Sequence, residues 1–117
     1  MKRTLVIALA LALQTGAALA HTALESETPA KDATVTAPET LTLTFSEAVT
    51  LAFTGITLTA ADGSIVTTGE ATLNADTGTI LTVPLTAPLP PGSYTVEWHA
   101  LSEDGHKVKG TYGFTVN

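Results

Sequence analysis

The sequence predicts an all-β domain, a β-sandwich of about seven strands with Greek-key connections, with a closed barrel as the main alternative. Two observations predict it. Many threonines and valines stand in alternation over short runs, and proline and glycine turn signals separate these runs. Beyond residue 20, apolar residues also rarely recur at the 3.6-residue spacing of a helix. These remaining residues, 21–117, fit one small domain and are too few for two.

The expected strands follow one another at short intervals. Leu41, Leu43 and Phe45 alternate and should share one face of a strand. Residues 56–59 and 65–66 flank the turn pair Asp62-Gly63 and should form a hairpin. Three later runs complete the domain: residues 80–83 after a turn at 76–78, then Tyr94, Val96 and Trp98 after Pro90-Pro91-Gly92, and finally Tyr112, Phe114 and Val116.

Residues 1–20 have the features of a cleaved export signal. Lys2 and Arg3 form a basic start, an apolar run covers residues 5–13, and Ala18-Leu19-Ala20 has the small residues that signal peptidase requires. The run is shorter than the roughly 20 residues of a membrane span, and no second run follows. We therefore expect cleavage after Ala20, a mature domain at 21–117, and no stable membrane insertion of the mature protein.

The composition excludes several functions. Removal of the leader leaves three lysines against eleven acidic residues, a net charge of −8, which argues against nucleic acid or an anionic membrane as partner. The chain has no cysteine, and its one methionine, Met1, lies in the leader. Thiolate and thioether metal sites, redox pairs and cysteine nucleophiles are excluded from the mature domain.

His21 becomes the N-terminal residue if cleavage follows Ala20. Its α-amine and its ring Nδ1 could then bind one metal ion as a chelate. Taken alone, a histidine at this position is more simply explained by chance.

A second candidate is the segment Ser102-Glu103-Asp104-Gly105-His106, expected to form a loop at one end of the sandwich. Asp-Gly favours a tight turn, which could bring the Asp104 carboxylate and the His106 imidazole together. An ordinary hairpin turn with a solvated histidine is the alternative.

Together, His21, Asp104 and His106 would offer an amine, two imidazoles and a carboxylate. This thiol-free, nitrogen-rich set suits a tetragonal Cu(II) ion, and copper heads the divalent affinity order. Zinc would bind the same donors less tightly, and calcium and magnesium prefer all-oxygen cages. The set requires the fold to bring residue 21 to the loop.

Several segments of the chain together resemble one known protein family. Four segments carry this resemblance: His21-Thr-Ala-Leu24 with Pro29-Ala30, Leu41-Thr-Leu-Thr-Phe45-Ser46-Glu47, Pro91-Gly92-x-Tyr94-x-Val96-x-Trp98, and Ser102-x-Asp104-Gly105-His106-x-x-x-Gly110-x-x-x-Phe114-x-Val116. In order and spacing they resemble the CopC family of periplasmic copper-resistance proteins over nearly the whole mature chain.

The resemblance implies an immunoglobulin-like sandwich with one Cu(II) at one end, bound by His21, Asp104 and His106. It places Glu47 beside the copper, where we expect it to hydrogen-bond a ligand or the amine rather than coordinate. It also implies a periplasmic carrier or buffer in copper resistance or homeostasis, not an enzyme, and an inner-membrane copper transporter of the CopD type as partner.

The sequence departs from family members with two copper sites, which hold Cu(I) in a methionine-rich loop. No methionine remains here after cleavage, so the chain resembles the Cu(II)-only members. Ala48 replaces a proline that many members carry, a change expected to affect only the local turn.

The remaining polar and aromatic candidates have simpler explanations. His99 should be an exposed strand histidine, and Trp98 should belong to the core. Glu103, Lys107 and Lys109 are expected to be surface charges.

Two other functions stay open from the residues. A copper monooxygenase would also use an N-terminal histidine with a second histidine, but the domain is small and offers no evident flat aromatic surface. A metal-free structural sandwich is the other, because this architecture hosts many binding modules.

Overall fold

The computed structural model describes residues 22–117, and the expected leader and His21 lie outside the described residues. Within residues 22–117 the chain forms nine strands and one short 3₁₀ turn, and no α-helix. The elements are β1 Leu24–Thr28, β2 Thr34–Val35, β3 Thr40–Phe45, η1 Leu51–Phe53, β4 Gly55–Ala60, β5 Ile65–Val66, β6 Thr72–Leu73, β7 Ile80–Pro84, β8 Gly92–Leu101 and β9 Lys107–Val116. The expected count was about seven; β2, β5 and β6 have only two residues each.

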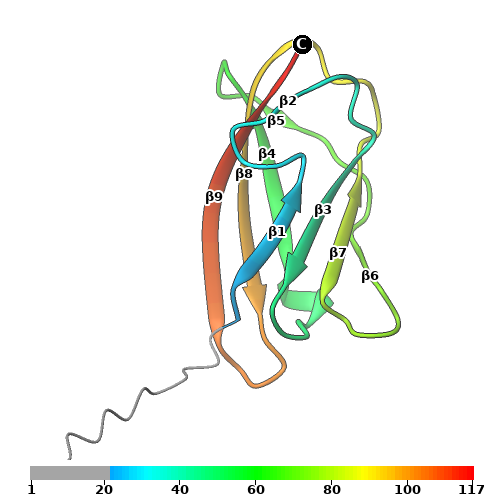
Figure 1. The fold of residues 1–117 in the computed structure, drawn as a ribbon, viewed down its shortest axis with the longest axis vertical. Coiled ribbons are helices and arrows are strands. Elements are labelled where there is room, and N and C mark those ends of the chain that lie inside the picture. The colour runs from blue at the N-terminus through cyan, green and yellow to red at the C-terminus, as the bar shows by residue number, and fades with distance from the viewer. Residues whose placement is uncertain (1–21) are drawn as a thin grey trace, which may run out of the picture.

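The strands form two sheets that pack face to face (Figure 1). One sheet has the order β1-β3-β7-β6, and the other has the order β2-β9-β8-β4-β5. The N-terminal segment contributes one strand to each sheet, because β1 pairs with β3 while β2 pairs in parallel with β9. This is the strand arrangement of an immunoglobulin-like sandwich. The predicted fold class is confirmed.

The alternating residues of the sequence line the space between the sheets. Leu41, Leu43 and Phe45 of β3 are buried, as are Tyr94 and Val96 of β8. Leu58, Leu81, Val83, Tyr112, Phe114 and Val116 complete most of the core. The predicted hairpin is present, since Leu58 pairs with Val66 and Thr59 with Ile65.

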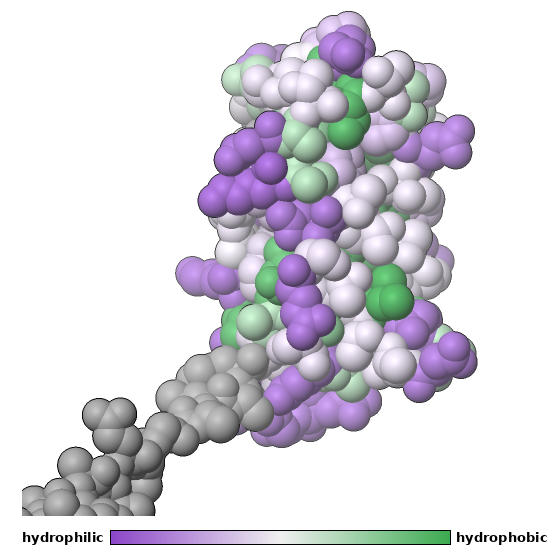
Figure 2. Space-filling view, viewed as in Figure 1, coloured by the Kyte–Doolittle hydropathy of each residue, from purple (hydrophilic) through white to green (hydrophobic). Residues whose placement is uncertain are grey.

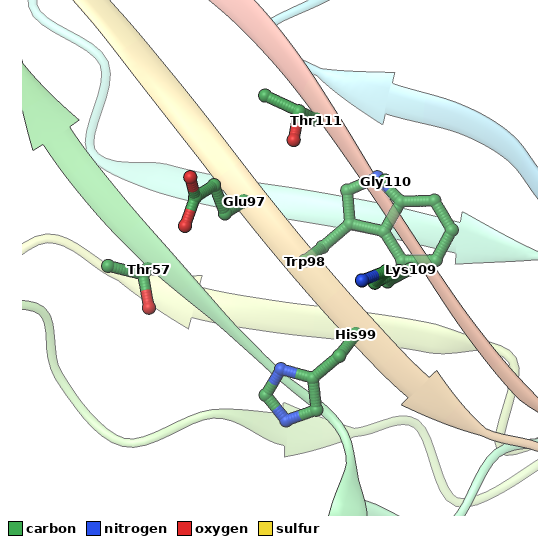
Figure 3. A pocket seen from close by; sticks show the side chains of 7 residues that line it. All are labelled: Thr57, Glu97, Trp98, His99, Lys109, Gly110 and Thr111. Carbon is green, nitrogen blue, oxygen red and sulfur yellow. The ribbon is translucent and has the colours of Figure 1, made fainter.

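Aromatic residues join the two sheets, which have no disulfide between them. The Trp98 ring of β8 meets the Phe45 ring of β3 edge to face, with centroids 5.6 Å apart. Such a pair contributes about 0.5–1.5 kcal/mol beyond its burial. Trp98 is half-buried against the core rather than fully within it. Its ring lies across β9 at Gly110 (Figure 3), where a Cβ atom would sit 2.6 Å from the ring.

Tyr94 fixes the entry to β8. Its hydroxyl donates a hydrogen bond of 2.6 Å to the Pro90 carbonyl, and its ring stacks on Phe114 of β9. The same corner recurs in immunoglobulin-like domains. It holds the long hairpin of β8 and β9 at the end opposite its connecting loop.

The molecular surface is largely polar on the face seen in Figure 2, where hydrophobic residues occupy only small separated spots. Among residues 22–117, no helix has the length and apolar character needed to cross a bilayer.

Candidate metal centre

The candidate metal loop connects β8 to β9, which pair from Gly92 and Val116 to Leu101 and Lys107. The loop is residues 102–106. It is closed by the Ser102 N–H, which donates to the His106 carbonyl at 2.9 Å, and by the Gly105 N–H, which donates to the Ser102 carbonyl at 2.9 Å. Gly105 has a φ of 92°, a conformation that favours glycine. The Asp-Gly turn predicted from the sequence is therefore present.

Ser102 holds the loop from the inside. Its side chain is 1% exposed. The hydroxyl donates a hydrogen bond to the Asp104 carboxylate and accepts one from the His106 N–H at 3.0 Å. One buried hydroxyl thus orients the carboxylate and fixes the backbone of the histidine.

Asp104 and His106 lie next to each other, as the turn predicted. The Asp104 Oδ1 and the His106 Nδ1 are 3.1 Å apart. Their side chains are 49% and 58% exposed, so both reach solvent. The Ser102 hydroxyl chiefly, and His106 in addition, lower the pKa of Asp104 below its usual value. Asp104 is therefore a carboxylate at neutral pH, which is the form that binds a metal ion.

The start of the described chain is fixed to the segment that carries Glu47. Thr22 is 3% exposed, and its hydroxyl donates to the Glu47 carboxylate at 3.1 Å. The backbone of Ala23 pairs with Ser46, since the Ala23 N–H donates to the Ser46 hydroxyl and the Ser46 N–H donates to the Ala23 carbonyl, each at 2.8 Å. Glu47 is thus next to the residue that follows His21.

The same segment continues into contact with the candidate metal loop. Val49 forms an isolated bridge with Ser102, and the Glu103 N–H donates to the Ala48 carbonyl at 3.1 Å. Figure 1 shows the start of β1 and the β8–β9 loop at the same end of the sandwich, opposite the C-terminus. Residues 46–49 therefore connect Thr22 to the candidate metal loop.

Within residues 22–117, histidine and acidic side chains do not form a group of three or more that could hold a metal ion. Asp104 and His106 supply two donors. The third predicted ligand, His21, lies outside the described residues. That His21 lies close to Asp104 and His106 stays a prediction.

The other histidine takes no part in this loop. His99 is exposed on the outer face of β8, where it pairs with Lys109 of β9 (Figure 3). This confirms the prediction of an exposed strand histidine. Glu103, Lys107 and Lys109 are also exposed, as predicted.

Sequence reasoning missed the supporting residues Ser102, Ser46 and Thr22. Each was visible in the sequence only as a small hydroxyl residue beside a candidate. Their roles depend on burial and on cross-strand contacts, which no local pattern encodes.

A carboxylate and an imidazole held at one end of an immunoglobulin-like sandwich define a small candidate metal-binding domain. The family model described as the CopC domain matches residues 24–117, and the chain belongs to the CopC family.

Solved structures agree with this family. The chain resembles the crystal structure of CopC from Methylosinus trichosporium OB3b at a TM-score of 0.77 and 35% identity, covering 83% of this chain and 94% of that one. It resembles PcoC, a methionine-rich copper resistance protein from Escherichia coli, at a TM-score of 0.75 and 38% identity, covering 84% of this chain and 100% of that one. Protein YobA from Escherichia coli K12 is 43% identical in an alignment of 118 positions that covers 97% of this chain and 95% of YobA. The family match and the copper resistance proteins among the relatives show that the chain has a copper-related function.

Proposed function

We propose that this chain is a periplasmic Cu(II) carrier or buffer that binds one ion and performs no chemistry on it. The ligands are the α-amine and imidazole of His21, the carboxylate of Asp104 and the imidazole of His106. The observation that carries the proposal is the Asp104–His106 pair, held by Ser102 at the end of the sandwich where Thr22 is anchored. Hydrogen bonds from Ser102 hold Asp104 and the His106 backbone, so binding should require little reorganisation of the loop.

The donor set determines when copper is held and when it is released. Nitrogen and carboxylate donors suit Cu(II), whereas Cu(I) prefers soft sulfur ligands that residues 22–117 do not provide. Reduction should therefore weaken binding. The amine and the imidazoles must lose their protons to coordinate, so acid should release the ion as well.

Cleavage of the leader creates one of the ligands. In the uncleaved chain the nitrogen of His21 belongs to a peptide bond with Ala20, and cleavage after Ala20 converts it into a free amine. The leader, residues 1–20, is thus part of the proposal, since it delivers the chain to the periplasm and its removal completes the ligand set.

Glu47 acts beside the copper rather than on it. One of its carboxylate oxygens accepts a hydrogen bond from the Thr22 hydroxyl, which fixes the residue directly after His21. Its negative charge also favours a bound cation nearby. An inner-membrane copper transporter of the CopD type is the proposed partner, on the strength of the family resemblance.

The proposal is tested by titrating the processed chain with Cu(II) and following its only tryptophan, Trp98, together with the copper absorption spectrum. A matched variant carries one additional alanine before His21, which replaces the amine by an amide. Because a donor itself is lost, affinity should fall by more than the ~10–100-fold that loss of a ligand's supporting group costs. Equal affinities would refute the N-terminal chelate, and more than one tightly bound copper per chain would refute the single site.

A further inference from the structure

An exposed apolar turn lies beside the candidate metal loop. None of the three residues of η1 is buried, and Leu51 and Phe53 are 42% and 63% exposed. Within residues 22–117 the other large apolar side chain this exposed is Ile65, on the β4–β5 hairpin. The apolar side chains of η1 are exposed to solvent, so packing in the core does not explain why this turn is apolar.

This turn borders a groove of about 500 Å³ on the outer side of β8 and β9. Phe53 and Ala52 line it from η1, His99 and Leu101 from β8, and Lys107 and Lys109 from β9. We call these six residues the basic groove. Its floor is a regular ladder, in which Leu101 pairs with Lys107 and His99 pairs with Lys109.

The charge of the basic groove is opposite to that of the domain. Residues 22–117 contain three lysines and eleven acidic residues, and two of the lysines line this groove. The acidic residues beside it are Glu97, which lines the adjoining depression with His99 and Lys109 (Figure 3), and Glu103 and Asp104 on the candidate metal loop. A cationic, apolar surface on a strongly anionic domain is complementary to an acidic partner that also presents an apolar side chain.

The basic groove also adjoins the proposed copper ligands. Lys107 directly follows His106 in the sequence, and the Thr50 N–H before η1 donates to the Leu101 carbonyl at 2.8 Å. A partner segment seated in the groove would therefore lie against the loop that holds Asp104 and His106.

We propose that the basic groove is a docking surface for an acidic segment, bearing an apolar side chain, of the protein that exchanges copper with this chain. The proposal rests on the proposed copper function. A membrane surface fits less well, because a flat anionic bilayer would also face the exposed carboxylates of Glu103 and Asp104 on the adjoining loop, whereas a short segment can contact the basic groove alone.

The test uses the processed, copper-loaded chain and a labelled synthetic peptide of six glutamates and two leucines, with binding measured by fluorescence anisotropy at low salt. Comparison peptides replace the glutamates by lysine or the leucines by serine, and both should bind more weakly. Vesicles of phosphatidylglycerol and sedimentation of the chain alone test a lipid surface and a second copy as occupants.

Variants locate the interaction. Phe53→Ser should weaken peptide binding about tenfold or more, because burial of a phenylalanine is worth at least a factor of ten. Lys107→Glu with Lys109→Glu should weaken it similarly and remove most of its salt dependence. The matched controls Ile65→Ser and Lys31→Glu remove an exposed apolar side chain and a cation elsewhere, and should bind as the unaltered chain does.

Equal peptide affinity of Phe53→Ser and the unaltered chain would overturn the proposal. So would binding to vesicles without binding to the acidic peptide, or self-association that the groove variants abolish. Copper titration of each variant separates the two proposals. If the unaltered chain binds no copper, the copper function fails; if copper binds normally and the peptide does not, only the docking surface fails.

Discussion

Replacing Ser102 with alanine removes the hydroxyl that holds the candidate metal loop. Ser102 is buried, and its hydroxyl accepts from the His106 N–H and donates to the Asp104 carboxylate. Loss of the hydrogen bond to the backbone should cost about 1 kcal/mol of folding free energy. For a domain of this size that lowers the Tm by roughly 4–8 °C.

The same substitution should affect copper more strongly than it affects the fold. Without Ser102, the Asp104 carboxylate is no longer oriented toward its neighbour His106. Loss of such a supporting hydrogen bond lowers metal affinity by about 10–100-fold. The measurement is a Cu(II) titration of the processed chain followed by Trp98 fluorescence, with a thermal melt of the same sample. Ser93→Ala, at an exposed position at the far end of β8, is the control.

A pH titration by NMR gives an independent reading of the same contact. The pKa of Asp104 is lowered from its usual 3.8, chiefly by Ser102, so the ionised carboxylate stabilises the fold above that value. This contribution is lost as the pH falls through the lowered pKa. In Ser102→Ala the pKa of Asp104 should move back toward 3.8. Unchanged copper affinity together with a lower Tm would show that Ser102 supports only the fold, and our reasoning about the loop would be wrong.

Three further predictions follow from other contacts. Glu47→Ala should release Thr22 and weaken Cu(II) binding, whereas Glu47→Gln, which keeps an acceptor for the Thr22 hydroxyl, should weaken it less in the same titration. Gly110→Ala places a Cβ atom 2.6 Å from the Trp98 ring, so it should cost about 1–3 kcal/mol in urea unfolding and alter the tryptophan emission, and a normal spectrum would contradict this packing. Tyr94→Phe removes the hydrogen bond to Pro90 and should cost about 1 kcal/mol while copper affinity stays unchanged.

The sequence predicted the elements that alternate clearly. The runs around Phe45, Leu58, Val83, Val96 and Phe114 each became a strand with its apolar residues buried, because a strand in a sandwich core must present every second side chain to the other sheet.

Short edge strands could not be predicted in the same way. The β1 segment, Leu24–Thr28, is mostly polar, and its exposed residues leave no alternation to detect. β2 and β6 are two residues long, so their pairing depends on the neighbouring strands rather than on their own sequence.

The candidate site was predictable in part for a related reason. An Asp-Gly turn between two paired strands defines a tight hairpin locally, so the approach of Asp104 to His106 followed from the sequence. The anchoring of Thr22 on Glu47 joins residues 25 positions apart, and only the assembled sandwich brings them together.

This anchor limits how far the preceding residue can travel. Any residue joined to Thr22 by a trans peptide has its Cα about 3.8 Å from that of Thr22. Under the proposed ligand set, a histidine there would need to search only a small volume, so little chain entropy would be lost on coordination. With those ligands, an N-terminal tag left on a recombinant protein would replace the amine by an amide, and the sample would report a falsely weak copper affinity.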